Sequence, residues 1–107
     1  QLKSLGFNTY YEKSVLDQYG YFAGKDADRA AELNKMFGNE KVDAILCVRG
    51  GYGAIRILDM LDYDLIKNNP KIFMGYSDIT AFLNAIHERT GLVTFHGPLG
   101  ISAFNDF

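Results

Sequence analysis

The chain reads Val42-Asp43-Ala44-Ile45-Leu46-Cys47-Val48-Arg49-Gly50-Gly51-Tyr52-Gly53, a mostly apolar run followed by a glycine-rich turn. An apolar run of this length, rich in branched side chains, is typical of a buried strand. After the turn, apolar residues recur at i, i+3, i+4 and i+7, which predicts an amphipathic helix: Ala54, Ile57, Leu58 and Leu61. The order strand, turn, helix is the building unit of a parallel α/β sheet.

The same alternation extends on both sides of this unit. Further strands are predicted at residues 7–11, 71–75 and 92–95. One helix is expected to begin with Asp26 as its N-cap, run to about Phe37 and stop at Gly38; another runs from about Ile79 to a stop at Gly91. Residues 1–6 resemble the last turn of a helix with its glycine stop. Strands that alternate with helices predict a parallel sheet with helices over both faces.

The amino-acid composition excludes several classes of protein. The chain has 107 residues, a net charge of −2 and 48% hydrophobic residues, which is typical of one folded domain rather than a disordered segment. Its 11 basic residues against 13 acidic ones give no basic footprint for nucleic acid or an anionic membrane, and no apolar segment is long enough to span a bilayer. One cysteine excludes an internal disulfide and a cysteine-based zinc site.

Three loops should meet at the carboxyl edge of such a sheet, which is where open α/β sheets bind ligands. They are residues 49–53, 75–78 and 96–98. In the second loop, Ser77 lies directly between a strand and a helix, as the serine of a nucleophile elbow does. The helix that follows would favour a developing oxyanion. The alternative is that Ser77 or Asp78 is only a helix N-cap.

The glycine loop has its own alternatives. Three glycines allow the backbone amides to point at an anion, so the loop could complete an oxyanion hole opposite Ser77 or cradle a phosphate. It could equally be a tight turn that serves helix packing. Arg49 could bind a substrate carboxylate or pair with a local acid, and Tyr52 extends the same loop.

Other candidates are weaker. His96 could act on Ser77 as a base if it came within about 3 Å, or it could be a structural loop histidine. We expect His87 on a solvated helix face and Cys47 as a small core side chain. No metal-spaced cluster of ligands is evident. The aromatic residues 19–22 are expected to be packing, or to wall a pocket.

Together these residues resemble the LD-carboxypeptidases (muramoyltetrapeptide carboxypeptidases), a family of serine peptidases. The shared motifs, in order, are Leu16-Asp17-Gln18-Tyr19-Gly20-Tyr21-Phe22-Ala23-Gly24, residues 29–34, 42–45 and 49–53, Leu61-Asp62-Tyr63, Pro70-Lys71, Gly75-Tyr76-Ser77-Asp78-Ile79-Thr80 and His96-Gly97-Pro98.

The resemblance implies a flavodoxin-like, class I glutamine-amidotransferase-like three-layer domain. It implies Ser77 as nucleophile, with the backbone amides of Asp78 and Gly51 in the oxyanion hole. Arg49, Gly50, Tyr52 and His96 are the candidate substrate-binding residues. The implied reaction removes D-Ala from murein tetrapeptide in cytoplasmic cell-wall recycling, without metal or cofactor. A related branch hydrolyses peptide-nucleotide antibiotics of the microcin type, and a non-catalytic anion-binding module is the alternative from another class.

In this family the Glu and His of the triad come from a second, C-terminal domain. Residues 1–107 are therefore expected to be a partial N-terminal, nucleophile-bearing domain, inactive alone because the base is missing. The resemblance also implies that a strand and helix precede Leu5. Without that strand an edge would be unpaired, so we expect either association of chains into a homo-oligomer or a rearranged sheet.

Overall fold

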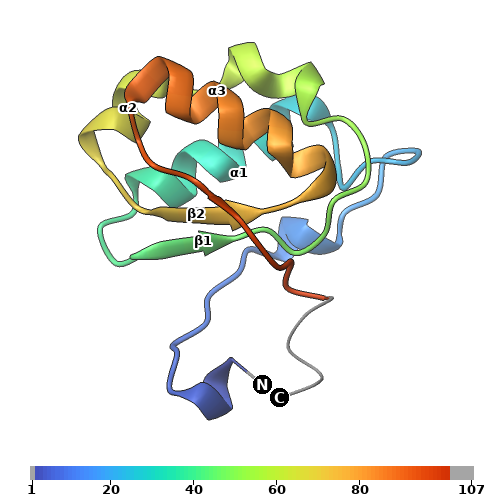
Figure 1. Ribbon diagram of the computed structural model, residues 1–107. Helices are drawn as coiled ribbons and strands as arrows, with labels where there is room; N and C mark the ends of the chain where they lie inside the picture. Colours follow the sequence, from blue (N-terminus) through green and yellow to red (C-terminus); the bar gives the residue numbers. More distant parts are fainter. Residues whose placement is uncertain (1, 102–107) are drawn as a thin grey trace.

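The computed structural model describes residues 2–101 and contains a parallel sheet. Its three strands are β1 (Ala44–Leu46), β2 (Ile72–Gly75) and β3 (Phe95–His96), in the spatial order β1-β2-β3. Ala44 pairs with Ile72 and Met74 pairs with Phe95, so β2 is central and all neighbours are parallel. The predicted α/β class is confirmed, with strands shorter than the apolar runs suggested (Figure 1).

The core lies between this sheet and the helices α1 (Asp26–Gly38), α2 (Tyr63–Asn68) and α3 (Thr80–Thr90). Phe73 at the centre of β2 is fully buried, with its ring 5.8 Å from that of Phe37 in α1 and 6.4 Å from that of Phe82 in α3. These three rings join helices distant in the sequence to one face of the sheet.

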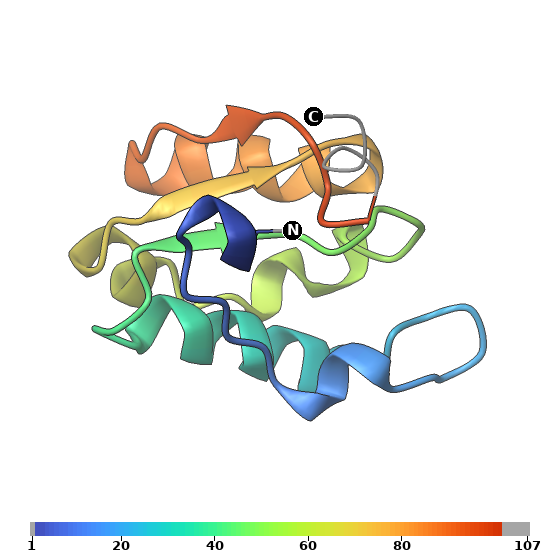
Figure 2. The same cartoon turned by 90° about the horizontal axis from the view of Figure 1, so that it is seen from below.

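All three α-helices cover the same face of the sheet (Figure 1). For α2 and α3 the reason is topological: the chain moves from β1 to β2 to β3 in one direction, and right-handed crossovers then place both connections on one side. The opposite face carries Ile72 and Phe95, about half exposed, together with Met74. Figure 2 shows the short 3₁₀ turn η1 (Lys3–Leu5) on that opposite side. Helices on both faces are therefore not seen within residues 2–101.

The predicted helix over residues 54–61 is a 3₁₀ helix, η3 (Ile55–Met60), and the helix α2 that follows it was not predicted. The N–H of Asp62 would continue an α-helix by bonding to the Leu58 carbonyl. It instead donates to Oδ1 of Asn34 at 2.9 Å, while the Tyr63 hydroxyl donates to that carbonyl at 2.6 Å. Asp62 then caps α2 by accepting from the Leu65 N–H. Tertiary bonds thus replace the helical ladder.

Two further predictions are wrong. Residues 7–11 form no strand, because no neighbouring strand in the described chain offers them a hydrogen-bonded ladder, and Phe7, Tyr10 and Tyr11 are exposed. Asp26 is the first residue of α1 rather than its N-cap, because its carboxylate binds Arg29 and Arg56 instead of backbone amides. A second 3₁₀ helix, η2 (Lys13–Leu16), precedes α1.

The glycine stops predicted at Gly6 and Gly91 are confirmed. Gly6 has φ 92° after η1 and Gly91 has φ 76° after α3, a left-handed conformation that glycine adopts without steric cost. Gly38 is instead the last residue of α1, which is capped by Asn39. Gln1 lies outside the described residues. In the part of the chain that the structure describes, no helix has both the length and the apolar character needed to cross a membrane.

Candidate active site

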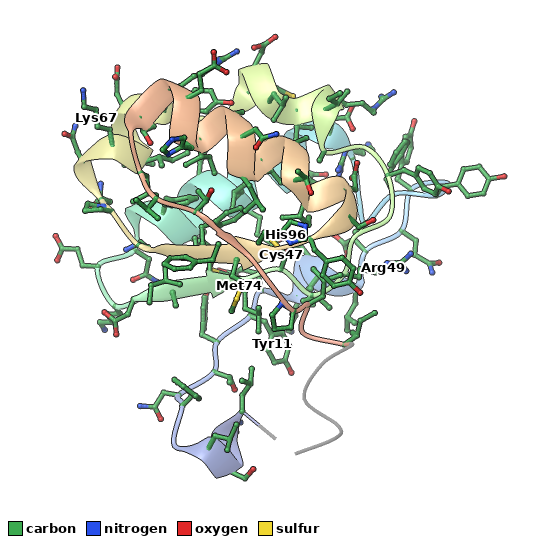
Figure 3. The ribbon with its side chains drawn as sticks, in the orientation of Figure 1. Tyr11, Cys47, Arg49, Lys67, Met74 and His96 are labelled. Atoms are coloured by element: carbon green, nitrogen blue, oxygen red, sulfur yellow. The ribbon has the colours of Figure 1, made fainter. Side chains whose placement is uncertain are left out.

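The three predicted loops do meet at the carboxyl edge of the sheet. Figure 3 shows Arg49, which follows β1, at the end of the sheet away from Lys67, which precedes β2. The N–H of Gly97 donates to the carbonyl of Gly75 at 3.1 Å, which brings the third loop to the end of β2. The segment then crosses to β1, where the N–H of Gly100 bonds to the carbonyl of Cys47 at 2.9 Å.

Ser77 has φ 62°, and within residues 2–101 no other non-glycine residue has a positive φ. It lies between β2 and the 3₁₀ turn η4 (Ser77–Ile79), which leads directly into α3, and its side chain is exposed. A left-handed backbone costs a residue with a side chain about 1–2 kcal/mol. Strain of this kind, kept at an exposed serine between a strand and a helix, matches the geometry of a nucleophile elbow.

The alternative of a relaxed N-cap serine does not fit this geometry. The residues at the capping positions are Tyr76 for η4 and Ile79 for α3, and neither position has a side-chain capping bond. Asp78 does not cap its own helix either, because its carboxylate binds the N–H of Ala54 in the glycine loop. Ser77 is thus placed by the turn itself and not by hydrogen bonds to its helix.

Gly75 explains how the turn tolerates a large residue two positions after the serine. A β-carbon placed on Gly75 would lie 2.6 Å from Cγ2 and 3.0 Å from Cβ of Ile79, which is buried. The usual elbow has a second glycine where this chain has Ile79. Here the space for the Ile79 side chain comes from Gly75 at the end of β2, because any larger residue at position 75 would collide with Ile79.

Gly50 brings the glycine loop against the serine. A β-carbon on Gly50 would lie 3.1 Å from Cβ and 3.4 Å from Oγ of Ser77. Gly51 and Gly53 have φ 107° and 98°, so this loop needs glycine for its backbone path as well. The structure thus places the exposed Ser77 side chain beside the backbone of the glycine loop.

One peptide group of this loop is held from two sides. Oδ2 of Asp78 accepts from the Ala54 N–H at 2.9 Å, and Nη2 of Arg29 donates to the Gly53 carbonyl at 3.2 Å. Arg29 in turn pairs with Asp26 at 2.6 Å, and Arg56 pairs with the same carboxylate at 2.7 Å. Hydrogen bonds from Arg56 and then Arg29 lower the pKa of Asp26 below its ordinary value. Sequence reasoning assigned no role to Arg29.

Arg49 is exposed and folds back over its own loop. A β-carbon on Gly51 would lie 3.7 Å from Nη2 of Arg49. None of the residues 2–101 forms an ion pair or hydrogen bond with the Arg49 side chain, so pairing with a local acid is not seen there. Tyr52 is 79% exposed beside it. A cation and an aromatic ring thus flank the glycine loop on the solvent side.

Within residues 2–101, neither histidine forms a hydrogen bond with the Ser77 side chain. His96 is exposed, is in register with Gly75 in the sheet, and has its ring 6.3 Å from that of Tyr76. Among the described residues no hydrogen bond joins His96 to Ser77, which leaves the base hypothesis without support. His87 is exposed on α3, as expected, with Nδ1 3.0 Å from the Leu92 carbonyl.

Cys47 packs partly buried against the core, as predicted, and burial raises the pKa of its thiol to about 12. Two hollows in the described surface, of about 460 and 350 Å³, lie along residues 3–9 and between the η2 region and α1. Ser77 lines neither of these two hollows, and its side chain is exposed. No three His, Cys, Asp or Glu side chains of residues 2–101 come together as metal ligands do.

Comparison with known proteins agrees with this geometry. Residues 1–97 match the family described as the LD-carboxypeptidase N-terminal domain. The chain belongs to the LD-carboxypeptidase family. The serine turn and the glycine loop both fall within the matched residues, and the family predicted from the motifs is therefore confirmed.

Three relatives illustrate the likeness. The probable murein peptide carboxypeptidase of Bacillus subtilis (strain 168) is 50% identical over 98 residues, 92% of this chain and 31% of the relative. The crystal structure of muramoyltetrapeptide carboxypeptidase from Oxalobacter formigenes is 31% identical, with a TM-score of 0.86 over 99% of this chain and 36% of its own. The microcin C7 self-immunity protein MccF, in complex with aspartyl sulfamoyl adenosine, is 39% identical, with a TM-score of 0.94 over 99% of this chain and 32% of its own.

The chain thus spans about a third of the length of the LD-carboxypeptidases that it matches. The fold of the matched third is shared at high similarity, so the arrangement of Ser77 and the glycine loop rests on the same architecture.

Proposed function

We propose that this chain is the nucleophile-bearing part of a serine LD-carboxypeptidase that removes a terminal D-amino acid from murein tetrapeptide. The observation that carries the proposal is Ser77, a strained and exposed serine at φ 62° beside Gly50. Membership of the LD-carboxypeptidase family and the name of the Bacillus subtilis relative support the substrate class.

In the proposed reaction, Oγ of Ser77 attacks the carbonyl carbon of the L-diamino acid and passes its proton to a base. The oxygen that becomes negative would accept hydrogen bonds from the backbone amides of Asp78 and Gly51. The C–N bond then breaks, D-Ala leaves as its amine with a proton, and water hydrolyses the acyl ester on Ser77. No metal or cofactor is needed for these steps.

The base and its orienting acid would be a His and a Glu from a C-terminal domain, as the family resemblance implies. The threefold greater length of the relatives leaves room for such a domain. Residues 1–107 would then be a partial domain, inactive alone, because loss of the base costs a serine protease about a millionfold in kcat. The protein would act in the cytoplasm during cell-wall recycling, as a homo-oligomer.

Arg49 is proposed to bind the carboxylate of the terminal D-Ala. It is exposed beside Gly51, and no acid within the described residues pairs with it. Tyr52, Gly50 and His96 would line the same substrate site. Replacing Arg49 with Met should raise KM for the tetrapeptide more than it lowers kcat, since a bound carboxylate contributes in both ground and transition states.

The deciding experiment compares the full-length protein with its Ser77→Ala variant on purified murein tetrapeptide, measuring D-Ala release. We expect a loss of at least about a thousandfold. Ser14→Ala is the matched control, because Ser14 bonds to Glu32 away from the strand ends. Unchanged release by Ser77→Ala would refute the role of Ser77, and release by the isolated 107 residues would refute the need for a second domain.

A second candidate function is hydrolysis of a peptide-nucleotide of the microcin type. It is favoured by the TM-score of 0.94 with the microcin C7 self-immunity protein MccF. Supplying both substrates to the full-length protein in competition would separate the two by kcat/KM. If neither is cleaved but phosphate-bearing ligands bind the glycine loop, the non-catalytic anion-binding alternative would stand instead.

A further inference from the structure

Phe22 is the contact between the aromatic turn and the glycine loop. A β-carbon on Gly53 would lie 2.7 Å from Cε1 and 2.8 Å from Cδ1 of the Phe22 ring. The guanidinium carbons of Arg29 and Arg56 lie 5.2 and 5.1 Å from the centre of that ring. Cation–π contacts at these distances are favourable, so two arginines hold the ring against Gly53.

The turn that carries Phe22 is closed by its own backbone. The N–H of Tyr19 bonds to the carbonyl of Phe22 at 2.9 Å, the reverse bond is 3.0 Å, and Gly20 between them has φ 61°. This tight turn directs Phe22 inward and leaves Tyr21 93% exposed. The two neighbouring aromatic residues therefore have different surroundings, although the sequence alone does not separate them.

Arg29 contributes both stacking and a hydrogen bond. Its side chain is 14% exposed and its Nε, buried, has no hydrogen-bond partner among residues 2–101. Nη2 carries the polar contacts, to Asp26 at 2.6 Å and to the Gly53 carbonyl at 3.2 Å. A buried donor without a hydrogen-bond partner lowers the stability of the fold. The stacking and the Nη2 hydrogen bonds of Arg29 must therefore compensate for the unpaired Nε.

We propose that Phe22 and Arg29 are positioning residues that set the direction of the Gly50 and Gly51 amides at Ser77. Phe22 and Arg29 contact Gly53 from one side, and the Asp78 carboxylate binds the Ala54 N–H from the other. Together they fix the C-terminal end of a loop whose glycines would otherwise allow many backbone conformations. The aromatic turn thus acts on the oxyanion site without touching substrate. This inference rests on the proposed function of Ser77 as nucleophile.

The test uses the full-length protein with Phe22→Ala, Phe22→Tyr and Arg29→Lys. A displaced oxyanion loop should lower kcat roughly 10- to 100-fold with little change in KM, since the substrate contacts remain. Phe22→Tyr keeps the ring and should restore most of the activity. Arg29→Lys should not, because an ammonium lacks the planar guanidinium that stacks on the Phe22 ring while Nη2 reaches both Asp26 and the Gly53 carbonyl. Asp28→Asn, on the exposed side of α1, is the control.

Amide hydrogen exchange provides a readout that does not depend on catalysis. Exchange at Ala54 should accelerate in Phe22→Ala and Arg29→Lys, and stay unchanged in Tyr21→Ala and Asp28→Asn. If exchange responds but no variant, nor the wild type, releases D-Ala, the proposed function fails while the positioning contact stands. Unchanged exchange at Ala54 together with unchanged kcat in Phe22→Ala would overturn the inference. A loss of kcat in Phe22→Ala with unchanged exchange at Ala54 would also overturn the inference.

Discussion

Asp78 and Ala54 are joined across the site: Oδ2 of the aspartate accepts the backbone N–H of Ala54 at 2.9 Å. The residue that follows the proposed nucleophile therefore holds the loop proposed to stabilise its transition state. A side chain that the sequence offered as a possible cap of its own helix ties together two loops that are 24 residues apart.

The contribution of this hydrogen bond to stability can be measured by replacing Asp78. Asp78→Ala should lower the free energy of unfolding by about 1–3 kcal/mol, because the Ala54 amide loses its partner in a half-buried place. Asp78→Asn keeps an acceptor oxygen and should lose less. Urea unfolding of the three proteins measures this, with Asp64→Ala on the exposed side of α2 as control. Equal stability of Asp78→Ala and wild type would show that the bond contributes nothing.

Gly50→Ala should damage activity more than stability. Its added carbon would lie 3.1 Å from Cβ of Ser77, so the serine or the loop must move by a few tenths of an ångström. We expect kcat to fall roughly 10- to 100-fold, as small misplacements at a reacting centre do. Gly38→Ala is the matched control, since its added carbon would be 3.5 Å from Leu65, an ordinary contact. Full activity in Gly50→Ala would place the reacting hydroxyl elsewhere.

Gly75→Ala should destabilise the fold through Ile79. The new carbon would lie 2.6 Å from Cγ2 of Ile79, and overpacking of this kind costs about 1–3 kcal/mol. Adding Ile79→Ala should recover part of that loss, giving a favourable coupling in a double-mutant cycle. Thermal or urea unfolding of the four proteins supplies the cycle. Strict additivity would mean that the two residues do not meet in solution.

Ser77→Gly should abolish activity and raise stability. Glycine adopts φ 62° without steric cost, so the strain of about 1–2 kcal/mol is relieved, less the entropy that glycine loses on folding. Ser77→Val should have the opposite effect on stability, because β-branched residues are poorly suited to a positive φ. Unfolding curves of these two variants and of Ser77→Ala decide it. A more stable Ser77→Val would contradict the left-handed turn.

Cys47 should make stability fall at alkaline pH. Its ordinary pKa of 9.0 is raised to about 12 in the folded chain, so between these values the unfolded state has lost a proton that the native state keeps. Stability present below pH 9 is therefore lost as pH rises toward 12, with a slope of up to roughly 1.4 kcal/mol per pH unit. The difference between wild type and Cys47→Ala isolates this effect. Rapid alkylation of native Cys47 at pH 8 would contradict its burial.

The sequence alone was enough for the strands β1 and β2, the helix α3 and the place of the serine. Apolar runs at β1 and β2 and the periodic positions of α3 are local properties, and Gly91 ends α3 because glycine tolerates a left-handed conformation there. Ser77 was found in the same way, since its place between a strand and a helix is visible along the chain. Whether its backbone is strained as in an elbow or relaxed as in an N-cap was left open by the sequence, and the structure gives φ 62°.

Only the tertiary structure decided which partners the side chains have. Residues 7–11 carry a strand pattern but no ladder. No α-helical bond joins the Asp62 amide to the Leu58 carbonyl after η3, because Asn34 accepts from the amide and the Tyr63 hydroxyl donates to the carbonyl. Phe22 and Arg29 meet Gly53 across more than 20 positions, and no local pattern encodes such a contact. Periodicity records which side of an element is apolar; which donor reaches which acceptor depends on the packing of all the elements together.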